Sequence, residues 1–175
     1  MMLVWVLVLT TLLASDVAGT SNSLGLEETQ HHIEKRNIGK QDCENDWVYY
    51  PPLKSCFRFF CHNRTWANAE EFCKHQPHSA HLASVSSRVH NIFLKKMIAA
   101  ESNGNLKIWI GLNDILREGT LVWVDGSTHI YRHWLQGEPN NHGGHQDCVI
   151  INNDDGGFWS DRPCLEMAPF ICSYH

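Results

Sequence analysis

Cysteines are the feature that most constrains what this chain can fold into. Seven of its 175 residues are cysteine, at positions 43, 56, 61, 73, 148, 164 and 172. None of them form a Cys-x-x-Cys pair, so the usual signatures of zinc-ribbon and thioredoxin-like proteins are missing. In an oxidising compartment these cysteines form disulfides by default. Spacing alone does not choose among the many possible pairings, and the odd count leaves at least one thiol over.

The N-terminus predicts export. Residues Met2 to Ala14 are apolar apart from Thr10 and Thr11, and this run is shorter than the ~20 apolar residues that span a bilayer. Small residues follow, and Gly19 offers a cleavage point. We therefore predict a signal peptide over residues 1–19 and a secreted, extracellular product without a membrane span. The alternative is an uncleaved anchor, since no Lys or Arg precedes the run.

A polar segment then leads into one domain. Residues 20–42 have little apolar periodicity and are predicted to be a tail or linker, and Lys35-Arg36 within them is either a processing site or a solvated charge pair. Aromatic residues and cysteines become dense over residues 43–175, which are numerous enough for a single core. The net charge is −5 and the sequence has no cluster of basic residues. This composition argues against nucleic acid or an anionic membrane as the partner.

Two helices and several short strands are expected. A first helix is predicted over 65–74, capped by Thr65, and a second over 86–100, capped by Ser86 and ended by Gly104. Short β-type runs occupy 108–110, 121–124 and 170–171, and 125–157 is predicted to be a long polar loop. In the first helix Trp66, Ala69, Phe72 and Cys73 share one face. In the second, helical spacing is followed by Val89, Ile92, Phe93, Lys96, Met97 and Ala100. Core positions are also expected for Trp47, Trp109, Trp123, Trp134 and Trp159.

Ordered landmarks over residues 43–173 resemble the C-type lectin domain family. They begin with Cys43, Asp46-Trp47 and Cys56. They continue with Trp66-Ala67-x-Ala69-Glu70-x-Phe72-Cys73, His81-Leu82-Ala83-Ser84 and Trp109-Ile110-Gly111-Leu112. The densest part is Glu138-Pro139-Asn140, Asp147-Cys148, Trp159-x-Asp161, Cys164 and Phe170-Ile171-Cys172.

The resemblance implies an α+β fold, with two helices packed on short antiparallel sheets, a long loop region and three disulfides. The pairs it implies are Cys43–Cys56, Cys73–Cys172 and Cys148–Cys164. Cys61 is left over. It is either a buried free thiol or the link of a disulfide-bonded homodimer, and the sequence leaves both open.

Glu138-Pro139-Asn140 resembles the family's mannose-type motif. Ca²⁺ prefers oxygen ligands, and two adjacent sugar hydroxyls can complete its coordination. Each hydroxyl can also donate to a carboxylate and accept from an amide group, which are the roles implied for Glu138 and Asn140. The resemblance further implies a cis peptide bond before Pro139. The expected partners are glycans with adjacent equatorial hydroxyls, whereas the family's galactose binders carry Gln-Pro-Asp.

The other implied calcium ligands depart from the family pattern. The projected set is Glu138, Asn140, Gln146, Ser160 and Asp161, where Gln146 replaces a usual Glu and Ser160 a usual Asn. The loss of a carboxylate predicts weaker Ca²⁺ binding, and the alternative is a vestigial site that binds no ion. The positions that match an auxiliary ion site of some members are Asp114, Glu118, Asn141, Gln146 and Asp147, which are otherwise ordinary loop residues.

Other motifs receive simpler interpretations. Asn63-Arg64-Thr65 is an N-glycosylation sequon. A spacing of three residues separates His75, His78 and His81, which on a helix could form a zinc site. Pro77 argues against such a helix. His142 and His145 lie in the projected binding loop, either near sugar or as solvated residues. No catalytic signature is present, and Asp154-Asp155 between glycines and asparagines is read as a solvated pair rather than catalytic carboxylates.

The sequence therefore predicts a calcium-dependent, mannose-type lectin that is not an enzyme and recognises microbial or cell-surface glycans. The alternative is a non-sugar member of the same fold, either ice-binding or a protein binder of the venom type. Gln146 and Ser160 keep that alternative open.

Overall fold

The computed structural model describes residues 43–102, 106–151 and 156–175. The predicted signal peptide, residues 20–42 with Lys35-Arg36, Gly104 and Asp154-Asp155 lie outside these ranges. Within them, no helix is long and apolar enough to cross a membrane.

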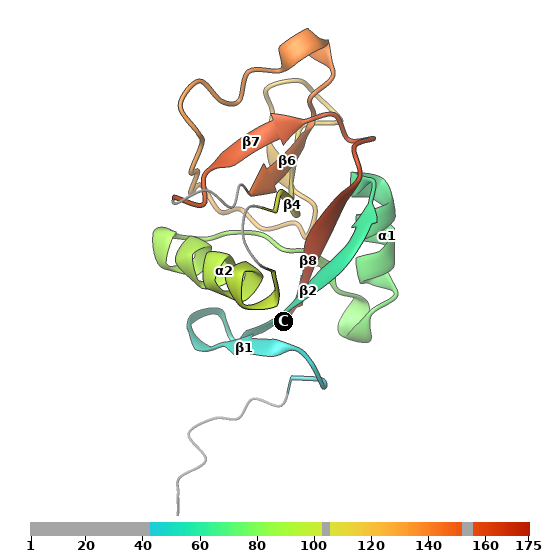
Figure 1. Cartoon of the computed structure of the whole chain (residues 1–175), viewed down its shortest axis with the longest axis vertical. Helices are drawn as coiled ribbons and strands as arrows, with labels where there is room; N and C mark the ends of the chain where they lie inside the picture. The colour runs from blue at the N-terminus through green and yellow to red at the C-terminus, as the bar shows by residue number, and fades with distance from the viewer. Residues whose placement is uncertain (1–42, 103–105, 152–155) are drawn as a thin grey trace, which may run out of the picture. The chain divides into compact units, whose positions relative to one another are not determined.

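The described strands form one hydrogen-bonded sheet (Figure 1). Its main path runs β1-β2-β8-β4-β6-β7, with β3 added to β8 and β5 to β4. All pairings are antiparallel except that of β4 with β8, where Trp109 is opposite Phe170. The strands are β1 Val48–Tyr50, β2 Ser55–Arg64, β3 His81–Leu82, β4 Ile108–Asn113, β5 Val122–Trp123, β6 Cys148–Ile151, β7 Trp159–Arg162 and β8 Ala168–Tyr174.

Alternating side chains of the sheet build two cores, as expected when successive residues of a strand point to opposite faces. In β4, Trp109 belongs to one core while Ile108 and Ile110 belong to the other. In β8, Phe170 and Cys172 join the core of Trp109, whereas Ile171 joins the core of Ile108. The helices divide in the same way, since residues of α1 pack in the Trp109 core and residues of α2 in the Ile108 core.

The first helix forms as predicted. Helix α1 spans Trp66–Lys74, and Thr65 caps it because its side chain accepts a hydrogen bond from the backbone N–H of Asn68. Trp66, Ala69 and Cys73 are buried, and Phe72 is half-buried against the same core. Helix α1 ends before Gln76 and Pro77, and the latter begins the short 3₁₀ turn η2 (Pro77–Ser79).

The predicted cap of the second helix is wrong, and of the six residues at the predicted spacing only Phe93 and Met97 pack against the core. Helix α2 spans Arg88–Glu101, and its cap is Ser87, whose side chain accepts from His90 N–H; Ser86 instead contacts the His90 ring. Val89 is 66 % exposed and Ile92 42 %, and Lys96 and Ala100 are exposed too. The buried positions are His90, Asn91, Leu94, Met97 and Ile98. Hydrogen bonds to Gly157 and Trp159 offset the desolvation of Asn91, whereas His90 is bonded only through Nδ1 and its Nε2 is buried without a partner.

The predicted 125–157 loop is too long. It contains β6 (Cys148–Ile151), which is buried throughout and pairs with both β4 and β7. An apolar run of four residues is short enough to be missed among so many Gly, Asn and Asp residues. The rest of the loop contains the 3₁₀ turn η3 (His142–Gly144). Trp134, which also lies in the loop, forms an isolated β-bridge with Trp159. Trp134 is half-buried, while the other four tryptophans predicted for the core are buried.

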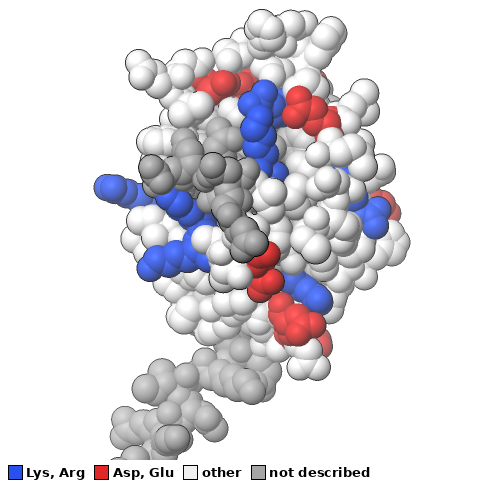
Figure 2. Space-filling view, viewed as in Figure 1, with Lys and Arg blue, Asp and Glu red and all other residues white. Residues whose placement is uncertain are grey.

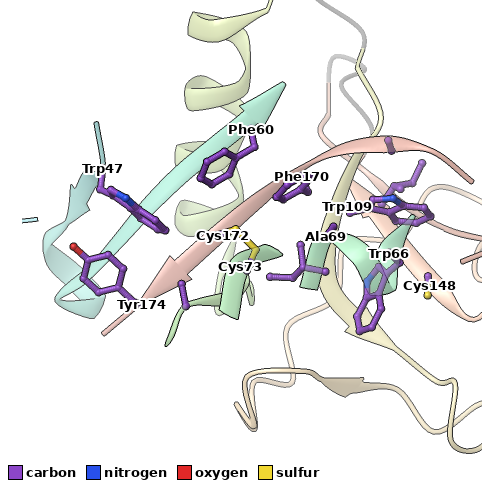
Figure 3. Close-up of a cluster of buried hydrophobic side chains, with 14 of the residues drawn as sticks. Trp47, Phe60, Trp66, Ala69, Cys73, Trp109, Cys148, Phe170, Cys172 and Tyr174 are labelled. Carbon is purple, nitrogen blue, oxygen red and sulfur yellow. A yellow bond between two sulfur atoms is a disulfide. The ribbon is translucent and has the colours of Figure 1, made fainter. Parts of the chain in front are cut away.

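Three disulfides brace this arrangement, with the pairs Cys43–Cys56, Cys73–Cys172 and Cys148–Cys164. The second joins α1 to β8 inside the Trp109 core (Figure 3). The third joins β6 to the turn after β7. It therefore holds together the two strands that follow the long loop. Cys61 is free and exposed, which excludes the expectation of a buried thiol.

Candidate functional site

The candidate site forms where the long loop returns to β7. Asp161 of β7 is buried, and both of its carboxylate oxygens accept from Asn140 N–H, at 3.1 Å each. The backbone N–H of Asn141 donates to the same carboxylate at 2.7 Å. These bonds hold the loop that carries Glu138-Pro139-Asn140 against the strand that carries Asp161. The two parts of the predicted motif therefore meet, although 20 residues separate Asn141 from Asp161.

Glu138 lies beside Asp161, so the site contains a pair of carboxyl groups. The peptide bond between Glu138 and Pro139 is cis, as the resemblance implies. Burial raises the pKa of Glu138 to about 7, with further contributions from a hydrogen bond and charge repulsion with Asp161; Arg162 opposes the shift. Burial by itself would also raise the pKa of Asp161, but hydrogen bonds from Glu138 and from backbone amides outweigh burial and lower it. One oxygen of Glu138, Oε2, is buried without a hydrogen-bond partner.

Amide side chains shape the rest of the loop. The backbone N–H of His142 donates to Asn140 Oδ1 at 2.9 Å and to Gln146 Oε1 at 2.6 Å. The backbone N–H of Gln146 donates to Asn141 Oδ1 at 3.0 Å. Through these bonds, Asn140 and Gln146 face the same turn, η3. Gln146 is only 8 % exposed, so its amide oxygen is part of a fixed arrangement.

Ser160 precedes Asp161 on β7 and pairs with Ile150 of β6. Its side chain is 1 % exposed, and its Oγ has no hydrogen-bond partner. A buried hydroxyl without a partner is costly in a folded protein, and a bound water or ion commonly explains such an atom. Ser160 Oγ and Glu138 Oε2 are thus two unsatisfied oxygens on residues of the projected ligand set.

This donor set fits a hard cation. It offers two carboxylates and amide and hydroxyl oxygens, the ligand types that Ca²⁺ takes. A cation would also offset the repulsion between Glu138 and Asp161. No cluster of three or more His, Cys, Asp or Glu side chains that could hold a metal occurs in the described part of the chain. Any ion here would therefore depend on the amide and hydroxyl oxygens as well as the carboxylate pair.

The residues of the auxiliary site are also close to one another. Asn141 Nδ2 donates to Glu118 Oε2, and the backbone N–H of Asp114 donates to the Asp147 carbonyl at 3.0 Å. Gly119 N–H donates to an Asp114 carboxylate oxygen at 2.9 Å. Desolvation and nearby carboxylates raise the pKa of Glu118, and these carboxylates are Asp114, Asp147 and Asp161. The acidic side chains of both projected sites therefore share one electrostatic environment.

The histidines of the long loop lie beside the candidate site, whereas those that follow α1 do not take part in it. His142 and His145 are exposed at η3, beside the candidate site. His75, His78 and His81 form no metal cluster, and His81 instead contacts the buried Glu70 carboxylate at 2.6 Å. Glu70 also accepts from Leu82 N–H at 2.9 Å, which fixes β3 to α1.

Arg162 is a site residue that the sequence analysis missed. It follows Asp161 on β7, and its positive charge favours the ionised form of Glu138. Its Nε is buried without a hydrogen-bond partner. The only signal in the sequence is its position next to Asp161, which does not distinguish it from a solvated surface arginine.

Comparison with known proteins identifies the fold and the family. The family model of the lectin C-type domain matches residues 62–174. The chain belongs to the C-type lectin family. A C-type lectin named as a mannose-binding isoform, from Oxyuranus scutellatus, is 36 % identical over 133 residues, which cover 74 % of this chain and 82 % of the relative.

Solved C-type lectin structures agree. The crystal structure of the C-type lectin CEL-I from Cucumaria echinata superposes with a TM-score of 0.71 at 28 % identity, covering 75 % of this chain and 96 % of CEL-I. A calcium-independent type II antifreeze protein superposes with a TM-score of 0.66 at 26 % identity, covering 75 % of this chain and 93 % of that protein. The fold is thus shared by at least one protein that is described as independent of calcium.

Proposed function

We propose that this chain is a secreted, calcium-dependent lectin that binds mannose-type sugars and recognises glycans on microbes or cells. The observation that carries the proposal is the approach of Glu138 to Asp161, with Asn140 held in the same loop. The projected calcium ligands are Glu138, Asn140, Gln146, Ser160 and Asp161. Such a protein binds and does not catalyse, in keeping with its family.

The side-chain geometry supports this assignment. Ca²⁺ would be held by the Glu138–Asp161 carboxylate pair and by oxygens of the neighbouring amides and Ser160, with sugar hydroxyls completing its coordination. Because Asn140 Oδ1 points toward His142 N–H, its amide group is oriented and its NH₂ remains as a donor. A hydroxyl can then accept from Asn140 and donate to Glu138, an arrangement that suits adjacent equatorial hydroxyls. The relative from Oxyuranus scutellatus, named as mannose-binding, supports the same specificity.

A second candidate is a member of the fold that binds no sugar. Gln146 and Ser160 reduce the negative charge of the projected ligand set, and the amide oxygens of Asn140 and Gln146 already accept hydrogen bonds. The structural likeness to a calcium-independent antifreeze protein supports this alternative. On this hypothesis the site is vestigial and the loop presents a surface to ice or to a protein.

Retention on mannose–agarose separates the two candidates. We expect the secreted protein to be retained with millimolar Ca²⁺ and released by EDTA. Calorimetric titration with Ca²⁺ should show a weak, saturable binding event and a rise in melting temperature. A folded protein that passes through the column and shows no heat with Ca²⁺ would contradict the lectin proposal and favour the second candidate.

Exchanging the donor and acceptor tests the specificity. The double variant E138Q/N140D should bind mannose at least tenfold more weakly and gain affinity for galactose, because the family's galactose binders carry Gln-Pro-Asp. A matched control, E166Q/N68D, makes the same chemical changes at two exposed positions outside the site. It should leave mannose binding unchanged. Equal losses in both double variants would show that the effect is one of charge or folding rather than of the motif.

The proposal includes three features outside the binding site. We propose that residues 1–19 are removed as a signal peptide, since three disulfides require an oxidising compartment. Asn63 is exposed and is proposed as a glycosylation site. Cys61 is proposed to link a homodimer, and two linked sites would compensate for weak single-site affinity through avidity. Beside the main site, an auxiliary ion is proposed to be held by Asp114, Glu118, Asn141 and Asp147.

A further inference from the structure

A cleft of about 430 Å³ lies along the outer face of α2, away from the residues proposed to hold calcium. One wall consists of helix residues 88, 92, 95, 96 and 99, which recur at the spacing of a single helical face. The other wall is formed by His133, Gly156 and Phe158. The helical wall extends over about 16 Å, at a rise of about 1.5 Å per residue.

The helical wall is positively charged. It carries Arg88, Lys95 and Lys96, and no described Asp or Glu lines the cleft. Arg88 and Lys96 form no ion pair with a described carboxylate, so their charges are available to a ligand. Blue side chains project over the helix that Figure 1 labels α2 (Figure 2). This local charge contrasts with the net charge of −5 of the chain, and it is produced by helical periodicity rather than by a basic run in the sequence.

The opposite wall is aromatic and is fixed in place. The rings of His133 and Phe158 stack with centroids 4.4 Å apart. His133 Nε2 is 3.1 Å from the Gly156 carbonyl oxygen, with which it forms a hydrogen bond. At the base of the cleft, buried Asn91 donates to the Gly157 carbonyl at 3.1 Å and accepts from Trp159 Nε1 at 2.8 Å. The two walls are therefore joined by hydrogen bonds through a side chain that is 1 % exposed.

We infer that this cleft binds a negatively charged glycan, such as a sulfated or uronic-acid-containing oligosaccharide. Lys and Arg recognise sulfate and carboxylate groups through charge-assisted hydrogen bonds, and Arg88 offers the bidentate geometry. The half-buried ring pair offers an apolar surface for the face of a sugar ring. The inference goes beyond the proposed function because it involves neither Ca²⁺ nor Glu138.

An acidic peptide or a lipid surface fits the cleft less well. The wall formed by α2 has its backbone hydrogen bonds satisfied within the helix, so it offers no strand edge to an extended peptide. A membrane surface requires a broad basic face, whereas here the cations line a hollow in an acidic molecule. A flexible polyanion of sugar rings can enter such a hollow and place its charges along the helix.

Heparin octasaccharide serves as the probe, with a chemically desulfated octasaccharide for comparison, and both are titrated in EDTA. We expect the wild type to bind the sulfated probe, and raising NaCl to weaken that binding. The double variant R88Q/K96Q should bind at least tenfold more weakly. Both substitutions lie on a helix surface, so melting temperature and Ca²⁺-dependent retention on mannose–agarose should match the wild type. The two measurements therefore test the cleft and the calcium site separately, and either proposal can be contradicted without the other.

The control variant K54Q/K107Q removes the same charge from two exposed positions outside the cleft. It should bind the sulfated probe like the wild type. Equal weakening by both double variants would overturn the inference, because it would reveal attraction to overall charge alone. Binding that requires Ca²⁺ or is displaced by mannose would also overturn it, as would equal binding of an oligoglutamate peptide to the same cleft.

Discussion

At the scale of single residues, His90 shows how a polar side chain can be part of a core. Its ring is fully buried, stacks on Tyr50 at 4.8 Å and contacts Phe57 edge-on. The backbone N–H of Ser86 donates to His90 Nδ1 at 3.2 Å, so this nitrogen is an acceptor and the ring is neutral. Burial, and to a smaller extent the charge of His129, lowers the pKa of His90 to about 4.

This pKa shift predicts that acid destabilises the fold through His90. The unfolded chain takes up the proton near pH 6.5, whereas the folded chain does so only near pH 4. The free energy of unfolding should therefore fall as the pH drops from 6.5 towards 4, by about 2 to 3 kcal/mol between pH 7 and 4.5. H90F removes the titrating group while keeping an aromatic ring. Urea unfolding in EDTA at both pH values should show a correspondingly smaller loss for H90F, and equal losses would contradict the assignment.

The same residues explain where sequence analysis failed. Apolar residues at helical spacing included Val89 and Ile92, which the structure exposes, while it buries the polar His90 and Asn91. Their burial depends on partners distant in sequence, since Asn91 bonds with Gly157 and Trp159. Hydropathy carries no information about such partners. The motif of the candidate site was readable because its chemistry resides in adjacent residues, whereas the role of Arg162 depends on which strand lies beside Glu138.

At the scale of secondary-structure elements, the start of α1 combines two properties in one side chain. Thr65 caps the helix, accepting from Asn68 N–H at 3.4 Å, and it also completes the sequon Asn63-Arg64-Thr65. This hydrogen bond is long and exposed to solvent, so its contribution should lie at the lower end of the usual range for N-caps.

Three substitutions separate the cap from the sequon. T65A should lose the glycan and about 0.5 to 1 kcal/mol of unfolding free energy, because both depend on the hydroxyl. T65S should keep both, and N63Q should lose only the glycan. Mass spectrometry with and without enzymatic deglycosylation reports the glycan, and urea unfolding of deglycosylated protein reports the cap. A deglycosylated T65A as stable as the wild type would show that the cap contributes nothing.

Elements with a local signal were predicted well. Thr65, Trp66 and Cys73 define α1 from sequence alone, and the runs at 108–110 and 170–171 lie within β4 and β8. Strand β6 was missed because its apolar run is only four residues long, and its pairing with β4 and β7 is not visible in the sequence. For the same reason, the parallel contact between Trp109 and Phe170 follows from the order of the strands in the sheet and not from either strand's sequence.

At the scale of the whole molecule, the fold brings chemistry together from distant segments. The candidate site joins the long loop to β7, and the cationic cleft joins α2 to residues 133 and 156–158. The resemblance to C-type lectins predicted the residues that meet in the first of these. The cleft was not predicted, since an acidic chain without a basic run indicated only weak attraction to polyanions, whereas Arg88 and Lys96 are brought onto one surface by the helix.

The proposed link through Cys61 would place two copies of the candidate site in one molecule. Cys61 lies in β2 where the pairing with β8 is irregular between Phe60 and Arg64, and its side chain is exposed. An exposed thiol in an oxidising compartment is open to disulfide exchange with a second copy of the chain. Two linked domains would bind a surface dense in mannose with higher apparent affinity than one domain, without any new contact to sugar.

We therefore expect the secreted protein to run at twice the monomer mass on a non-reducing gel and at the monomer mass after reduction. C61S should be monomeric under both conditions and should keep its melting temperature, because Cys61 lies outside the three intrachain disulfides. Its affinity for a single mannose should equal that of the wild type, whereas its apparent affinity for immobilised mannan should fall at least tenfold. A wild type that is monomeric without reductant would exclude the linked dimer, and any avidity would then require non-covalent association.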